Sequence, residues 1–165
     1  MEEALIVDEV TEDEVNFKAE ESAGLEKKEF KLRSFADIKA DLAKPVPRSR
    51  LKELPKAGAK FLYIPWFFAV KALDKYAPGW SYEIIGTDVI SRPEKLEYVM
   101  KVRLTIRALE GNFSHDAAGT AMQEWDDAKK KLKPVYGGLA EIAESAALRR
   151  AAAKHGLCLD LYIDE

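Results

Sequence analysis

Three consecutive segments in the middle of the chain alternate apolar and polar side chains, with only a short turn between one segment and the next. A period of two puts the apolar side chains on one face of a strand, and short turns join antiparallel neighbours. Such a meander needs other elements to cover its apolar face. We therefore predict three strands, over residues 80–90, 97–109 and 113–118.

Helices are predicted on both sides of these strands in the sequence. Ser34 is placed to cap a short helix, which Pro45 stops. A second helix is predicted over 66–77, because apolar residues recur there at three- and four-residue steps behind a β-prone run at 61–64. The segment 48–60 between the two is predicted to be a basic loop.

The last and longest helix is predicted over 139–155, opened by a glycine pair and closed by Gly156. It is so rich in alanine that its backbone can approach a sheet or a neighbouring subunit closely. With 165 residues, 47% of them hydrophobic, the chain has enough apolar content for one core. We predict an α+β fold: an antiparallel three- to four-stranded meander packed on the long C-terminal helix, with short N-terminal helices.

The net charge of -3 conceals an uneven distribution. Residues 1–30 hold 3 lysines against 11 acidic residues, whereas residues 31–165 hold 23 basic against 18 acidic residues. We therefore divide the chain into an acidic, disordered leader over 1–30, with at most one short strand at 4–7, and a basic folded domain over 31–165. A basic body favours a polyanionic partner, while the leader either aids solubility or masks the basic surface.

Motifs for catalysis are absent from the sequence. It contains none of the common signatures of ATP, dinucleotide, metalloprotease or serine hydrolase sites. The single Cys158 allows no intramolecular disulfide and lies in an apolar run, so we expect it to be buried and inert. No apolar run approaches the ~20 residues of a membrane helix. We predict no catalytic residue, no metal and no cofactor, in a soluble protein of a reducing compartment.

His115 and Asp116 offer the alternative of a small enzyme. His115 and Asp116 are adjacent in a predicted strand, where neighbouring side chains face opposite ways and do not readily share one site. His155 precedes the glycine that ends the last helix, and we expect a capping or surface residue there.

The second predicted strand carries three cations on one face: Lys101, Arg103 and Arg107. Side chains two apart on a strand are about 7 Å from each other, close to the repeat of phosphates along an extended single strand. This face could therefore follow a nucleic-acid backbone. The alternative is a solvated outer face whose cations pair with acids of neighbouring strands, such as Glu83 or Asp116.

Other cations lie in the predicted loops and at the end of the last helix. Arg149, Arg150 and Lys154 are placed either to bind phosphates or only to stabilise the helix C-terminus. A second basic cluster forms either an outer DNA contact or a solvated face: Lys129, Lys130, Lys131 and Lys133. Aromatic residues are frequent between residues 61 and 82; most are expected in the core, and one or two could stack on bases.

The order of these elements and several local strings resemble the annealing core of the RAD52 family of single-strand annealing proteins. The match spans about residues 35–163, and its order and spacing are more specific than any single motif. The strings are GAKFLYI at 58–64, FSHDAAGT at 113–120 and ESAALRRAAAKHG at 144–156.

The resemblance implies a ring-forming protomer that needs neither ATP nor metal and holds single-stranded DNA in a basic groove. It places Arg149 and Arg150 at the family's helix-borne basic pair, and Tyr63 at a tyrosine of the groove. Arg50, or else Arg48, matches an arginine of the preceding loop. A further family arginine corresponds to Ala153, where only the adjacent Lys154 could replace it.

With the resemblance, we expect a single-strand annealing domain over 31–165, acting in recombination or DNA repair. The predicted partners are single-stranded DNA, further copies of the chain in a ring, and a single-strand-binding or other recombination protein. We expect a cytoplasmic location, in a bacterial or phage-infected cell. An RNA-binding or structural oligomer built on the same basic sheet is the alternative binding module.

Overall fold

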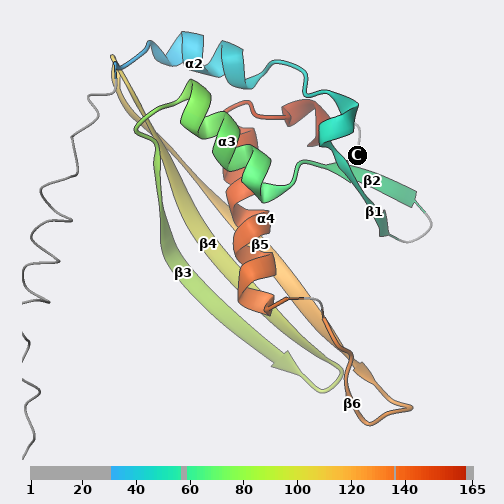
Figure 1. Ribbon diagram of the computed structural model, residues 1–165. Helices are drawn as coiled ribbons and strands as arrows, with labels where there is room; N and C mark the ends of the chain where they lie inside the picture. The colour runs from blue at the N-terminus through green and yellow to red at the C-terminus, as the bar shows by residue number, and fades with distance from the viewer. Residues whose placement is uncertain (1–30, 57–58, 136, 163–165) are drawn as a thin grey trace, which may run out of the picture. The chain divides into compact units, whose positions relative to one another are not determined.

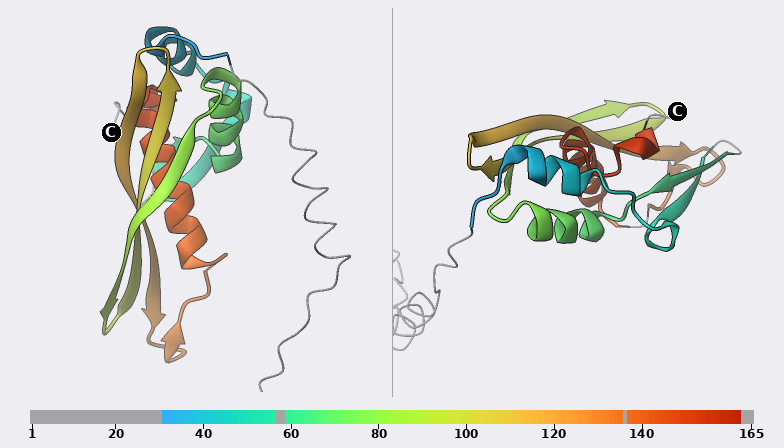
Figure 2. Two further views of the ribbon diagram at one scale, coloured as in Figure 1. Left: turned by 90° about the vertical axis from the view of Figure 1, so that its left-hand side faces the viewer. Right: turned by 90° about the horizontal axis from the view of Figure 1, so that it is seen from above.

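The computed structural model describes residues 31–56, 59–135 and 137–162. Within this part a four-stranded antiparallel sheet has the order β3-β4-β5-β6, and the hairpin β1-β2 forms a separate two-stranded sheet. Three α-helices, α2, α3 and α4, lie on one side of the larger sheet, with α4 next to the strands (Figures 1 and 2). The predicted α+β fold is confirmed. No helix among the described residues is long and apolar enough to span a membrane.

The meander consists of three long strands. β3 spans Ser81–Arg92, β4 spans Lys95–Ala108 and β5 spans Gly111–Asp126. The short β6, Lys131–Leu132, pairs only with Trp125 and Asp126 at the end of β5. β5 continues eight residues beyond the predicted strand, and this extension begins with Gly119, which lies against the backbone of α4, and Ala121, which is buried.

Helix α4, Leu139–Lys154, packs its alanines directly against β4 and β5. The alternate side chains of β4 that face it are buried, among them Val102, Leu104 and Ile106. The approach is close at Gly119 of β5, where an added Cβ would lie 2.0 Å from the carbonyl oxygen of Ala143. The alanines of α4 therefore allow its backbone to pack closely against the sheet of the same chain.

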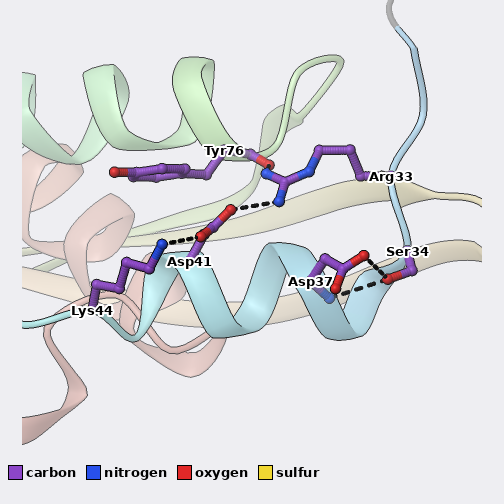
Figure 3. Close-up of polar contacts among 6 residues, drawn as sticks. All are labelled: Arg33, Ser34, Asp37, Asp41, Lys44 and Tyr76. Carbon is purple, nitrogen blue, oxygen red and sulfur yellow. Dashed lines mark hydrogen bonds and ion pairs between the residues drawn. The ribbon is translucent and has the colours of Figure 1, made fainter.

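Helices α2, Phe35–Leu42, and α3, Trp66–Tyr76, complete the core. The Ser34 hydroxyl caps α2 by accepting from the N–H of Asp37 at 3.1 Å, as predicted. Arg33 then joins the two helices, because its guanidinium donates to the carbonyl of Tyr76 and to the carboxylate of Asp41 (Figure 3). Lys44 pairs with the same carboxylate, and the two cations lower the pKa of Asp41, with the Lys44 bond the larger cause.

The predicted basic loop at 48–60 is wrong in part. After the 3-10 turn η1, Arg48–Arg50, the chain forms β1, Lys52–Lys56, which pairs antiparallel with β2, Ala59–Tyr63. The β-prone run before α3 therefore pairs, as part of β2, with the preceding basic segment. Pro55 has no backbone N–H to donate to a neighbouring strand, but an edge strand such as β1 tolerates this loss. The predicted disordered leader over 1–30 and its short strand at 4–7 lie outside the described residues.

We expect Gly119→Ala to lower the free energy of unfolding by about 3 kcal/mol, because its methyl group would meet the backbone of α4. Gly86→Ala is the matched control: its Cβ would lie 3.7 Å from a Lys101 side-chain carbon, and we expect a change below about 1 kcal/mol. Urea unfolding at one protein concentration measures both variants. Equal stability of Gly119→Ala and the wild type would contradict the close contact.

Candidate nucleic-acid interface

A groove of about 460 Å³ lies where the β1-β2 hairpin, the start of α3 and one flank of α4 meet. Glu141, Ser145 and Arg149 line it from α4, at four-residue steps along the helix. The opposite side carries two kinds of side chain, cationic and aromatic: Lys52, Tyr63, Trp66 and Phe67. We call this the α4 groove.

The contacts that hold Arg149 in the α4 groove include a ring and two backbone carbonyls. Its guanidinium carbon lies 4.8 Å from the centre of the Tyr63 ring, in a cation–π arrangement. Its Nε donates to the carbonyl of Ser145 at 3.0 Å, and one terminal nitrogen lies 3.5 Å from the carbonyl of Ile64. The structure therefore brings together two of the residues predicted for the DNA site, Arg149 and Tyr63.

Lys52 belongs to the α4 groove although the sequence reasoning did not assign it to the site. It stands opposite Tyr63 in the β1-β2 register, so the two side chains share one face of the hairpin. Two positions before it, Arg50 lies over the ring of Phe68 at 5.0 Å, and that ring is 4.8 Å from Phe67 of the groove. Arg50 thus flanks the groove, while Arg48 is exposed in the same 3-10 turn.

Arg150 lies on the other flank of α4, because successive residues of a helix are about 100° apart. Its guanidinium donates to the carbonyl of Ala118 at 2.8 Å. Lys154, one turn later, donates to the carbonyl of Asp116. These two cations therefore lie along the edge of β5, and the predicted basic pair is divided between two surfaces.

The outer face of the sheet carries Lys101, Arg103 and Arg107 of β4, and the first two are paired with acids. Arg103 makes two bonds to Asp116, at 2.7 and 2.8 Å, and Lys101 pairs with Asp88 at 2.8 Å. The Asp116 bond raises the pKa of Arg103 and lowers that of Asp116. Arg107 stands further along the same face, opposite Asn112. This arrangement is the one expected of the alternative, a solvated face of ion pairs.

The lysine-rich segment runs through the turn after β5, the short β6 and the residue that follows it, at the tip of the sheet (Figure 1). Lys133 pairs with Glu124 at 2.8 Å, and Lys129 lies 4.0 Å from Asp126. Lys130 and Lys131 are exposed beside them. The structure does not bring this cluster to Arg149.

His115 and Asp116 point to opposite faces of the sheet, as predicted, although both are exposed at the strand edge and line one shallow surface pocket with Arg103, Ser114 and Lys154. Asp116 bonds Arg103 on the outer face, whereas the exposed His115 lies on the helix side, with its ring 4.6 Å from that of the buried His155. His155 does cap α4, but the expectation of a surface residue is wrong for it, since it is 1% exposed. Cys158 is buried as expected, and burial raises the pKa of its thiol to about 11.

Two curated proteins of Arabidopsis thaliana are similar to this chain. DNA repair RAD52-like protein 1, mitochondrial, is 30% identical over 133 residues, which are 81% of this chain and 70% of that protein. DNA repair RAD52-like protein 2, chloroplastic, is 35% identical over 133 residues, which are 79% of this chain and 61% of the relative. No family model matches the chain.

The described domain is thus an α+β unit whose long helix borders a groove of cations and aromatic rings. By its similarity to these relatives, the chain belongs to the RAD52-like family of DNA repair proteins.

We expect His155 to make the fold sensitive to acid. Its Nε2–H donates to the carbonyl of Leu104 at 3.3 Å, while Nδ1 is buried without a hydrogen-bond partner in the described structure. Burial lowers the pKa of His155 from 6.5 to about 4. A lowered histidine pKa means that stability is complete above pH 6.5 and falls towards pH 4, by at most about 3 kcal/mol.

Urea unfolding at several pH values measures this loss, with His155→Leu as the variant that cannot titrate. The wild type should lose stability between pH 6.5 and 4, and the variant should show a flatter slope whatever its absolute stability. Asp41, Asp116 and Glu124 have lowered pKa values, so their contributions are lost in a more acidic range. If stability fell with pH equally steeply in the wild type and in His155→Leu, the acid sensitivity would not come from His155.

Proposed function

We propose that this protein binds single-stranded DNA and anneals complementary strands without ATP, in recombination or DNA repair, as a homo-oligomeric ring. The observation that carries the proposal is the α4 groove, in which Arg149, stacked on Tyr63, lies opposite Lys52 in a chain of the RAD52-like family. Arginine fixed by stacking offers phosphates a planar donor group. The start of α3 at the same groove adds the positive end of a helix dipole.

Phosphate contacts suit an annealing protein for a physical reason. They are blind to sequence and leave base edges available, so complementarity between the strands supplies the specificity. The two basic flanks of α4 suit a strand that crosses successive copies of the chain, with Arg149 on one side and Arg150 with Lys154 on the other. Single-strand-binding or recombination proteins remain predicted partners, and the cytoplasmic location stays a prediction of the sequence.

The paired cations of the outer sheet face have a secondary place in this proposal. Phosphates would have to displace Asp116 and Asp88 from Arg103 and Lys101 before they bound there. Four lysines remain the proposed second, outer contact because their side chains are exposed: Lys129, Lys130, Lys131 and Lys133. Asp126 and Glu124 already pair with the first and the last of them.

Strand annealing tests the proposal, with two complementary labelled oligonucleotides and no ATP or metal. The wild type should accelerate annealing, and Arg149→Ala with Arg150→Ala should remove the acceleration. The double variant should also weaken single-strand binding and lower the slope of log affinity against log salt by about 1.4, since each contact contributes roughly 0.7. Fluorescence anisotropy at several salt concentrations gives the slope.

A second double variant, Lys101→Ala with Arg103→Ala, removes the same number of cations from the outer face. We expect a smaller loss of affinity and a smaller change of slope, because carboxylates already hold these side chains. If the outer variant lost more binding than the α4 groove variant, the strand would follow the sheet instead. Preference for RNA or duplex DNA in the same assay, without annealing, would favour the alternative binding module.

A further inference from the structure

Trp66 is exposed where the sequence pattern would bury it. It stands first on the apolar stripe of α3, whose later members Leu73 and Ala77 are completely buried. Trp66 itself is 52% exposed, and its neighbour Phe67 is 41% exposed. A large aromatic surface left in water at this position has no role in the core of the described domain.

The surroundings of Trp66 combine aromatic rings with cations. Its ring lies 6.2 Å from that of Phe67, edge to face, and the Phe67 ring is 4.8 Å from that of Phe68. Arg50 lies over Phe68 at one end of this row, and Arg149 lies over Tyr63 in the α4 groove, which Trp66 also lines. Exposed rings beside fixed cations are the composition of surfaces that hold single-stranded nucleic acid.

Trp125 provides an internal comparison. It is 37% exposed and lines a groove of about 500 Å³ at the far end of the sheet. Two cations and three carboxylates line that groove: Arg92, Lys95, Glu94, Glu124 and Asp127. The α4 groove has two cations, Lys52 and Arg149, and one carboxylate, Glu141. A phosphate beside a stacked base is therefore favoured at Trp66 and disfavoured at Trp125.

We propose that the Trp66 indole is a stacking platform for one base of the bound strand, next to the phosphates held by Arg149 and Lys52. The inference rests on the proposed function and adds a contact to the base. A stacked base keeps its pairing edge open, so the contact is compatible with annealing and independent of sequence. Each copy of the chain would hold one base in this way.

The competing occupant of this surface is a second copy of the chain. Trp66 also lines an adjoining groove with Trp80, Tyr82 and Glu144, and an apolar contact between copies would cover the same ring. Glu141 and Glu144 both line that groove, which makes it unsuited to phosphate but not to a protein surface. The experiment therefore has to separate loss of stacking from loss of assembly.

The test uses the full chain and two fluorescent oligomers of equal length, one of thymidines and one with the bases replaced by an abasic backbone. Anisotropy gives their affinities for the wild type, Trp66→Leu, Trp66→Phe and the matched control Trp125→Leu. Trp66→Leu should bind the thymidine oligomer about 5- to 150-fold more weakly. It should bind the abasic oligomer as the wild type does, with an unchanged salt slope. Trp66→Phe should recover most of the affinity.

Tryptophan fluorescence and light scattering complete the test. Binding of the thymidine oligomer should quench the emission of the wild type and of Trp125→Leu, and Trp66→Leu should lose this quenching. Unchanged thymidine affinity in Trp66→Leu would overturn the inference while the proposed function stood. If Trp66→Leu formed smaller particles and lost equal affinity for the thymidine and the abasic oligomers, the stacking inference would be overturned in favour of a contact between copies of the chain. Failure of the wild type to bind either oligomer would overturn the proposed function and this inference with it.

Discussion

The contact between the backbone of α4 and that of β5 at Gly119 is the constraint on which the rest of the structure depends. A helix approaches a sheet this closely only if neither surface carries a side chain larger than a methyl group at the crossing. The alanines of α4 and the glycine of β5 meet that condition together. Because interiors are close-packed, a bulkier residue at the crossing would move the helix as a whole and every side chain that it presents.

The position of α4 in turn decides which cations act together. Arg149 and Arg150 are adjacent in the chain, but the helix directs them to opposite flanks, one to the β1-β2 hairpin and one to the edge of β5. The hairpin supplies Tyr63 and Lys52 to the first flank only. A displacement of the helix by a fraction of a turn would separate Arg149 from Tyr63, so packing in the core sets the geometry of the α4 groove.

Much of the fold could be predicted because its signals are local. Ser34 before α2, the period of two along β3 and β4, and the glycines around α4 each act within a few residues. The strand β1 was missed because its own composition is that of a loop, and it forms by pairing with another segment, β2. The prediction ended β5 before Gly119, a residue of low strand propensity whose place in the strand is explained by its close contact with the backbone of α4.

The residues of the candidate site, too, could be predicted only in part. Arg149 and Tyr63 were predicted from the resemblance, and they are in contact. Lys52 could be assigned to the site only once the register of the β1-β2 hairpin was known, and Trp66 only once the structure showed that it is exposed. An alternating row of cations on β4 is visible in sequence, but the acids that pair with it come from β3 and β5. Spacing along one strand says nothing of the charges beside it.

The bonds from Arg150 and Lys154 to carbonyls of β5 have a consequence for the behaviour of the protein in solution. In the described part of the chain, β5 has a neighbouring strand on that side only at Trp125 and Asp126. An uncovered strand edge is a template for adding further strands, and charged side chains over it are a common protection against aggregation. The same two side chains therefore contribute to colloidal stability and to the proposed affinity for DNA. Selection on either property would act on both, and a relative that moved its DNA contact elsewhere would still need a charge here.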